Sequence, residues 1–110
     1  MIDDFQRHIA VPKNQKGIEE CLSAEYSKDN VAVFTISQEE MDQLFKTGIM
    51  GKLNSIKGVL IDDYESDFIP RDKLSDCLAV FKESNIMKDS NLALAMKAGL
   101  NYGFGIYTEF

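Results

Sequence analysis

The sequence is short of the residues on which many small catalytic and metal sites depend. Its 110 residues include one histidine, two cysteines and no tryptophan. A zinc site needs several nitrogen and sulfur ligands, so His8 cannot form one alone. Cys21 and Cys77 each fall on the apolar face of an expected helix. This pattern indicates buried thiols rather than a disulfide or a metal site.

Long apolar runs and an excess of basic residues are absent as well. No stretch approaches the ~20 apolar residues of a membrane span, and the acidic start at residues 1–4 is unlike the basic start of a signal peptide. With 18 acidic and 12 basic residues, the net charge is −6. Such a surface repels phosphate backbones and anionic membranes. We therefore expect a cytoplasmic protein that binds neither nucleic acid nor membrane directly. The charge favours a basic partner, although a mild acidity that only keeps a protein soluble is also common.

Complete catalytic motifs are missing too. The nucleophile elbow G-x-S-x-G does not occur, and the glycine–lysine pair at Gly51 and Lys52 lacks the following serine or threonine of a phosphate-binding loop. A pairing of His8 with either cysteine has no local support. We expect no catalytic residues, no cofactor and no enzymatic activity.

Apolar periodicity predicts a single small α/β domain over residues 1–110, with an α+β arrangement as the alternative. Helices are expected at residues 2–9, 15–26, 37–48, 70–82 and 90–99, and residues 49–57 have a spacing that leaves a short irregular helix open. Strands are expected at residues 31–36, 58–61 and 102–110. Together they predict a short sheet of about three strands covered by four to five helices. Helical crossovers favour parallel pairing, and a mixed sheet stays open.

Local signals mark the starts and faces of these helices. Ser37 and Glu40 match a capping box, in which the serine accepts a backbone N–H and the glutamate reaches back. Asp89 or Ser90 is expected to cap the last helix. A stripe of apolar residues marks the helix after Pro70, at Leu74, Cys77, Leu78 and Phe81.

An acidic segment follows the expected buried strand at residues 58–61. It contains Asp62, Asp63, Tyr64, Glu65 and Asp67. Its carboxylates suit a hard cation or an acid–base pair, although the spacing does not match a calcium-binding loop. They also suit a solvated turn with helix-capping acids. The third interpretation is a recognition surface, with a tyrosine anchor and carboxylates that pair with a partner's basic residues. Glu39, Glu40 and Asp42 form a second acidic patch.

The segment Ile61–Pro70, with the apolar stripe after it, resembles the strand, acidic turn and amphipathic helix of small bacterial immunity proteins. Those paired with contact-dependent growth-inhibition toxins are the most similar in character. The resemblance implies stoichiometric binding to a toxin domain, often a nuclease, whose basic cleft an acidic protein can cover.

On this hypothesis the partner-binding residues are the two acidic groups: Asp62, Asp63, Tyr64, Glu65 and Asp67, with Glu39, Glu40 and Asp42. Two alternatives remain, a small metal-assisted hydrolase that uses the acidic segment and a general adaptor or regulatory domain. The protein is expected to be a monomer or a homodimer. Tyr102, Tyr107 and an exposed last strand would support the dimer.

Overall fold

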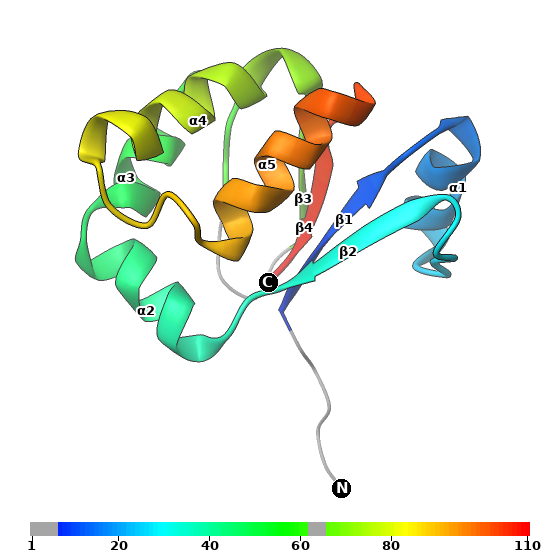
Figure 1. The fold of residues 1–110 in the computed structure, drawn as a ribbon, viewed down its shortest axis with the longest axis horizontal. Coiled ribbons are helices and arrows are strands. Elements are labelled where there is room, and N and C mark those ends of the chain that lie inside the picture. Colours follow the sequence, from blue (N-terminus) through cyan, green and yellow to red (C-terminus); the bar gives the residue numbers. More distant parts are fainter. Residues whose placement is uncertain (1–6, 62–65) are drawn as a thin grey trace, which may run out of the picture.

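Four helices gather on one side of an antiparallel sheet, and a fifth lies apart from them (Figure 1). The computed structural model describes residues 7–61 and 66–110. The elements in chain order are β1 (His8–Pro12), α1 (Gln15–Ser23), β2 (Val31–Thr35), α2 (Gln38–Lys46), α3 (Ile49–Asn54), β3 (Ser66–Ile69), α4 (Arg71–Ser84), α5 (Asn91–Tyr102) and β4 (Ile106–Glu109). The prediction of one small domain that mixes helices and strands is confirmed.

The sheet has the strand order β2-β1-β4-β3, and every neighbouring pair is antiparallel. The preference for parallel pairing was therefore wrong. Its physical reason lies in the connections, since α4 and α5 pack against each other as an out-and-back pair. Because of this pair, β4 begins where β3 ends, and Ile69 faces Ile106. A single crossover helix would have brought the chain back to the other end.

The prediction of a helix at residues 2–9 was wrong for its described part, because His8 and Ile9 belong to β1. Residues 1–6 lie outside the described part of the chain. Ile9 and Val11 point to the core under the helices, and Ala10 points to the opposite face, all fully buried. Pro12 is tolerated because the β1–β4 ladder covers only His8–Ala10, so no ladder bond is lost there.

The strand expected at residues 58–61 does not form. Val59 and Ile61 are buried while Leu60 is exposed, but the backbone of Ile61 bonds to a side chain. Its N–H donates to Asn54 Oδ1 at 2.7 Å, and Asn54 Nδ2 donates to its carbonyl at 2.9 Å. The third strand lies later, at β3, so Asp67 is in the sheet and not in a loop.

The helices after Pro70 and Ser90 follow their predicted patterns, with a correction at the end of the second. Leu74, Cys77 and Phe81 of α4 are buried as the stripe predicted. Gly99 does not end α5. It lies inside the helix, where an added Cβ would approach Ile106 Cγ2 to 2.6 Å. The helix ends at Gly103, whose φ is +90°.

The last strand also differs from expectation. Tyr102 belongs to α5, and β4 starts at Ile106. Because β1 and β3 pair with β4 on both sides, β4 has no open edge for a dimer to use. The edges of the sheet are β2 and β3.

The two faces of the sheet are covered to different extents. Helix α5 contacts β1, β2 and β4 on one face, where the large core lies. On the other face α1 contacts β1 and β2, and Cys21 packs with Ala10 and Val31. The β3 end of this second face is less protected, and Phe68 is exposed there. Within the described ranges, no helix is long and apolar enough to cross a bilayer.

Candidate functional site

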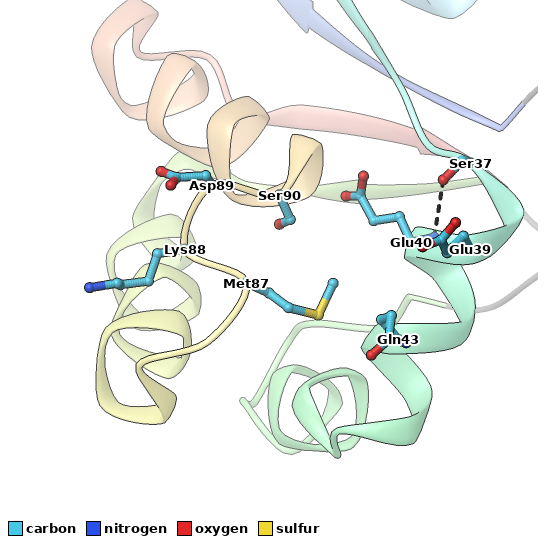
Figure 2. Close-up of a pocket in the computed structure, with 8 residues that line it drawn as sticks. All are labelled: Ser37, Glu39, Glu40, Gln43, Met87, Lys88, Asp89 and Ser90. Atoms are coloured by element: carbon cyan, nitrogen blue, oxygen red, sulfur yellow. Dashed lines mark hydrogen bonds between the residues drawn. The ribbon is translucent and has the colours of Figure 1, made fainter.

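An open groove with a volume of about 620 Å³ lies between the start of α2 and the connection from α4 to α5. Figure 2 shows that its two walls come from chain segments far apart in the sequence. The residues that line it are Ser37, Glu39, Glu40, Gln43, Met87, Lys88, Asp89 and Ser90. We call it the acidic groove.

Two helices begin at the acidic groove, and a serine caps each. Ser37 Oγ accepts a hydrogen bond from the backbone N–H of Glu40 at 3.0 Å. Ser90 Oγ accepts one from the N–H of Ala93 at 3.1 Å. The Ser37 cap was predicted from the sequence, and Ser90 was one of two candidates with Asp89, because a serine that starts a helix satisfies an N–H with no partner inside that helix.

The glutamate of the capping box reaches across to the other helix. Glu40 Oε2 accepts a hydrogen bond from the N–H of Leu92 at 3.2 Å, in the first turn of α5. Beside it, Asn91 Nδ2 donates to the carbonyl of Thr35 at 2.7 Å. These two bonds tie the start of α5 to the end of β2 and the start of α2. Hydrogen bonds from side chains to the backbone therefore hold the two walls of the groove together, in addition to side-chain packing.

Carboxylates outnumber basic groups around the acidic groove. Glu39 and Asp89 are exposed, and Glu40 is half-buried. Asp42 lies just beyond the lining on α2 and accepts from Gln38 Nε2 at 2.9 Å. Lys88 is the basic member of the lining. Figure 2 shows its ammonium and the carboxylate of Asp89 both pointing away from the groove, whereas the carboxylate of Glu40 points across it toward Ser90. The open space therefore faces the Glu40 carboxylate rather than the Lys88 ammonium.

An apolar side chain extends over the middle of the acidic groove. Met87 reaches from the α4–α5 connection toward Gln43 (Figure 2). Its backbone has a φ of +56°, the left-handed conformation that a residue with a Cβ rarely adopts. Ser90 N–H donates to its carbonyl at 3.1 Å, which stabilises this turn. A flexible thioether among carboxylates suits contact with the long stem of a lysine or arginine.

The structure brings together only part of the predicted site. Glu39 and Glu40 line the acidic groove, and Asp42 lies next to it. Asp67 lies in β3, opposite Thr108, and does not line the groove. The rest of the acidic segment falls outside the described residues, namely Asp62, Asp63, Tyr64 and Glu65.

Sequence reasoning missed the second wall of the groove. The local sequence marks Met87 only as part of a linker between helices and Asp89 only as a candidate helix cap, and it assigns neither to a binding site. A local signal for an exposed connection does exist in this region. Asn85 caps the end of α4 and Ser90 caps the start of α5, so only a short connection lies between them. The missing information was the tertiary contact that places this connection beside α2.

The described residues offer little to a metal ion or a covalent mechanism. They contain no group of three or more histidine, cysteine, aspartate or glutamate residues arranged to hold an ion. Burial raises the pKa of both thiols, Cys21 and Cys77, to about 11, with smaller contributions from nearby carboxylates. Such thiols hold almost no thiolate at neutral pH and are poor nucleophiles. His8 Nε2 lies 3.0 Å from the Tyr26 hydroxyl, a hydrogen-bonded pair on the α1 side of the sheet.

No protein-family model, no curated protein and no solved structure matches this chain. Its function must therefore be inferred from its own surface.

Proposed function

We propose that this protein is a non-catalytic inhibitor of the bacterial immunity type, which binds a basic toxin domain in the cytoplasm and neutralises it. The observation that carries the proposal is the acidic groove, which gathers Glu39, Glu40 and Asp89 around two helix starts that the Glu40–Leu92 hydrogen bond joins. A carboxylate held in this way, as that of Glu40 is, loses little freedom when it meets a cation, so more of the attraction appears as affinity.

The whole-chain charge supports the same partner chemistry. A net charge of −6 steers a basic surface toward the groove and repels nucleic acid. A nuclease active site is itself basic, because it must hold phosphates. An acidic inhibitor that covers such a site excludes the substrate by occupying the groups that bind it. Of the pattern that resembles immunity proteins, the amphipathic helix is present as α4, whereas the strand expected before the acidic segment does not form.

The expected contact is a row of lysine or arginine side chains laid across the acidic groove. Their charged ends would pair with Glu39 and Asp89, both exposed, while an apolar stem would rest on Met87. Pairs at the rim of an interface mainly raise the rate of association and set specificity. The partner's affinity should therefore depend strongly on salt.

The direct test uses the cognate toxin domain, which on this proposal is encoded immediately upstream of this gene. The purified chain and that domain should form a complex of one copy each in titration calorimetry. The same ratio should abolish the toxin's activity in vitro, and co-expression should restore growth. Absence of a complex at micromolar concentrations would overturn the proposal.

A further inference from the structure

A second hollow, with a volume of about 350 Å³, lies on the α1 side of the sheet. It is bounded by α1 and by the paired strands β3 and β4. The described residues that line it are Cys21, Leu22, Ser66, Asp67, Phe68, Tyr107 and Glu109. We call it the aromatic hollow.

One wall of the aromatic hollow is a fixed pair of rings. Phe68 and Tyr107 face each other across β3 and β4, with ring centroids 4.7 Å apart and planes tilted by 40°. The Phe68 ring also lies against Gly105, where an added Cβ would approach its Cε1 to 2.9 Å. Although it is held on two sides, Phe68 is 45% exposed. A large apolar side chain that is both held and exposed is a common feature of binding surfaces.

The opposite wall is aliphatic. Leu22 is 73% exposed, the largest value among the exposed large apolar residues of the described chain. The neighbouring Cys21 is buried against the sheet and closes the base. Leu22 therefore exposes most of its surface to solvent beside the aromatic pair.

The rim of the aromatic hollow is acidic. Of its seven described lining residues, two are acidic and none is basic. The Glu109 carboxylate accepts a hydrogen bond from Ser66 Oγ, which fixes its position. Its negative charge reaches the nearby groups, because it adds to the effect of burial in raising the pKa of Tyr26. The last turn of α1 contains no basic side chain to offset the partial negative charge of that helix end.

We propose that the aromatic hollow accepts an arginine side chain of the protein partner. The planar guanidinium would stack on the Phe68–Tyr107 pair and donate hydrogen bonds to Glu109, and its stem would lie along Leu22. Arginine fits better than lysine because a weakly hydrated plane stacks on a ring more readily than a compact ammonium does. The identity of the partner rests on the proposed function, whereas the preference for arginine does not.

The sheet register places the aromatic hollow within reach of the acidic groove. Thr35 pairs with His8, His8 with Glu109, and Glu109 with Ser66, so these residues form one row across the sheet. The chain leaves this row at Thr35 and reaches Ser37, which lines the acidic groove. Both sites therefore lie at the same end of the sheet, and one partner that wraps this end can contact both.

The preference for arginine can be tested without the toxin. The probe is the tripeptide acetyl-Gly-Arg-Gly-amide, and its control carries the neutral isostere citrulline. In two-dimensional NMR titrations of the full chain, the arginine tripeptide should shift the backbone signals of Leu22, Phe68 and Glu109, with a Kd of about 1–10 mM. Citrulline should bind at least about fivefold more weakly, since it lacks the charge. Equal binding of the two peptides, or shifts spread over the whole surface, would overturn the inference.

Variants locate the site and separate it from the acidic groove. Phe68→Ala and Glu109→Gln should each abolish the difference between the two peptides. The matched controls are Phe45→Ala, an exposed phenylalanine on α2, and Glu83→Gln, an exposed glutamate on α4. These should leave that difference unchanged. A difference that survives Phe68→Ala in a folded variant would overturn the inference.

The partner itself provides the second measurement. Phe68→Ala should weaken binding of the toxin domain at least about tenfold, as loss of an interface anchor does. If the toxin binds the wild type and Phe68→Ala equally well, the hollow is not part of the interface while the proposed function stands. If the toxin domain does not bind at all, the proposed function fails. The tripeptide titration alone then shows whether the aromatic hollow binds arginine.

Discussion

The carboxylate of Glu40 accepts a hydrogen bond from the backbone N–H of Leu92, with 3.2 Å between Oε2 and the nitrogen. The two residues are 52 positions apart in the sequence. This bond satisfies an N–H at the start of α5 with a side chain from α2. It therefore joins the two walls of the acidic groove and fixes one of its carboxylates.

Replacing Glu40 by alanine should destabilise the protein by about 1 kcal/mol, because a helix N–H loses its partner. In a domain of this size the melting temperature should fall by about 4–8 °C. Glu39→Ala is the control, since Glu39 is an exposed neighbour on the same helix turn, and it should cost a few tenths of that. Urea unfolding measures both. Equal losses in the two variants would contradict the role assigned to Glu40.

Asn54→Ala should have a larger effect, about 2–4 kcal/mol. The Asn54 side chain serves both backbone groups of Ile61, a residue with no exposed surface, and each buried group left without a partner costs about 1–3 kcal/mol. Asn54→Asp keeps the acceptor for the N–H but faces the carbonyl with a second oxygen, so it should also destabilise. Asn101→Ala, an exposed asparagine on α5, is the control in urea unfolding. A loss below about 1 kcal/mol for Asn54→Ala would show that this clamp is not needed.

Two helical glycines should respond in opposite ways to alanine. A Cβ on Gly99 would lie 2.6 Å from Ile106 Cγ2 and 2.7 Å from Leu74 Cδ1, whereas a Cβ on Gly51 would meet nothing within 4 Å. Gly99→Ala should cost about 1–3 kcal/mol through overpacking. Gly51→Ala should stabilise the protein by about 0.5–1 kcal/mol, because alanine restricts the unfolded chain more than glycine does. Thermal unfolding checks both signs, and a Gly99→Ala variant as stable as wild type would show that α5 and β4 are packed less closely.

The pH dependence of stability should report on Glu20. Hydrogen bonds from the Asn30 side chain and the Ser27 N–H lower the pKa of Glu20 below its ordinary value of 4.5. Since the folded value lies below the unfolded one, this contribution is fully present above pH 4.5 and is lost as the pH falls through the folded value.

Glu20→Gln removes that titration. Wild type should be more stable than this variant at neutral pH, and the difference should shrink as the pH falls below 4.5. Melting temperatures measured from neutral to acidic pH test the prediction. A difference that is constant with pH, or that grows in acid, would show that the Glu20 charge does not stabilise the turn.

Local patterns predicted the elements whose information is local. Ser37 caps the helix that it was predicted to start, and Ser90, one of the two predicted candidates, caps the last helix. Helix α4 buries the stripe that contains Leu74 and Phe81. A cap or a helical stripe depends on residues a few positions apart. A short stretch of sequence therefore contains all the information needed to predict a cap or a helical stripe.

The wrong predictions concern choices that only the tertiary structure makes. Ile9 fits a helical spacing with residues that precede it. It lies in a strand instead, because β2 and β4 supply hydrogen-bond partners on both sides of β1. The apolar run Val59–Ile61 predicts a strand, but the side-chain amide of Asn54 makes the hydrogen bonds to the Ile61 backbone that a neighbouring strand would have made. Neither partner is visible in the local sequence.

The same limit applies to the candidate site. Glu39, Glu40 and Asp42 could be selected from the sequence as an acidic patch. Their position beside Asp89 could not, because it depends on how α3, β3 and α4, which lie between them in the chain, fold back. The aromatic pair of Phe68 and Tyr107 likewise depends on the register of β3 against β4.

The central claim is that the carboxylates of the acidic groove bind a basic toxin domain. The most direct measurement is the Kd of the proposed cognate toxin domain for wild type and for the double variant Glu39→Lys, Asp89→Lys. The control is Asp29→Lys, Asp76→Lys, which changes the net charge equally at two exposed aspartates outside the groove. We predict that the groove variant binds at least about tenfold more weakly than the control at ~0.15 M salt, and that the gap narrows at ~1 M salt. Equal affinities of the two folded variants would contradict the account.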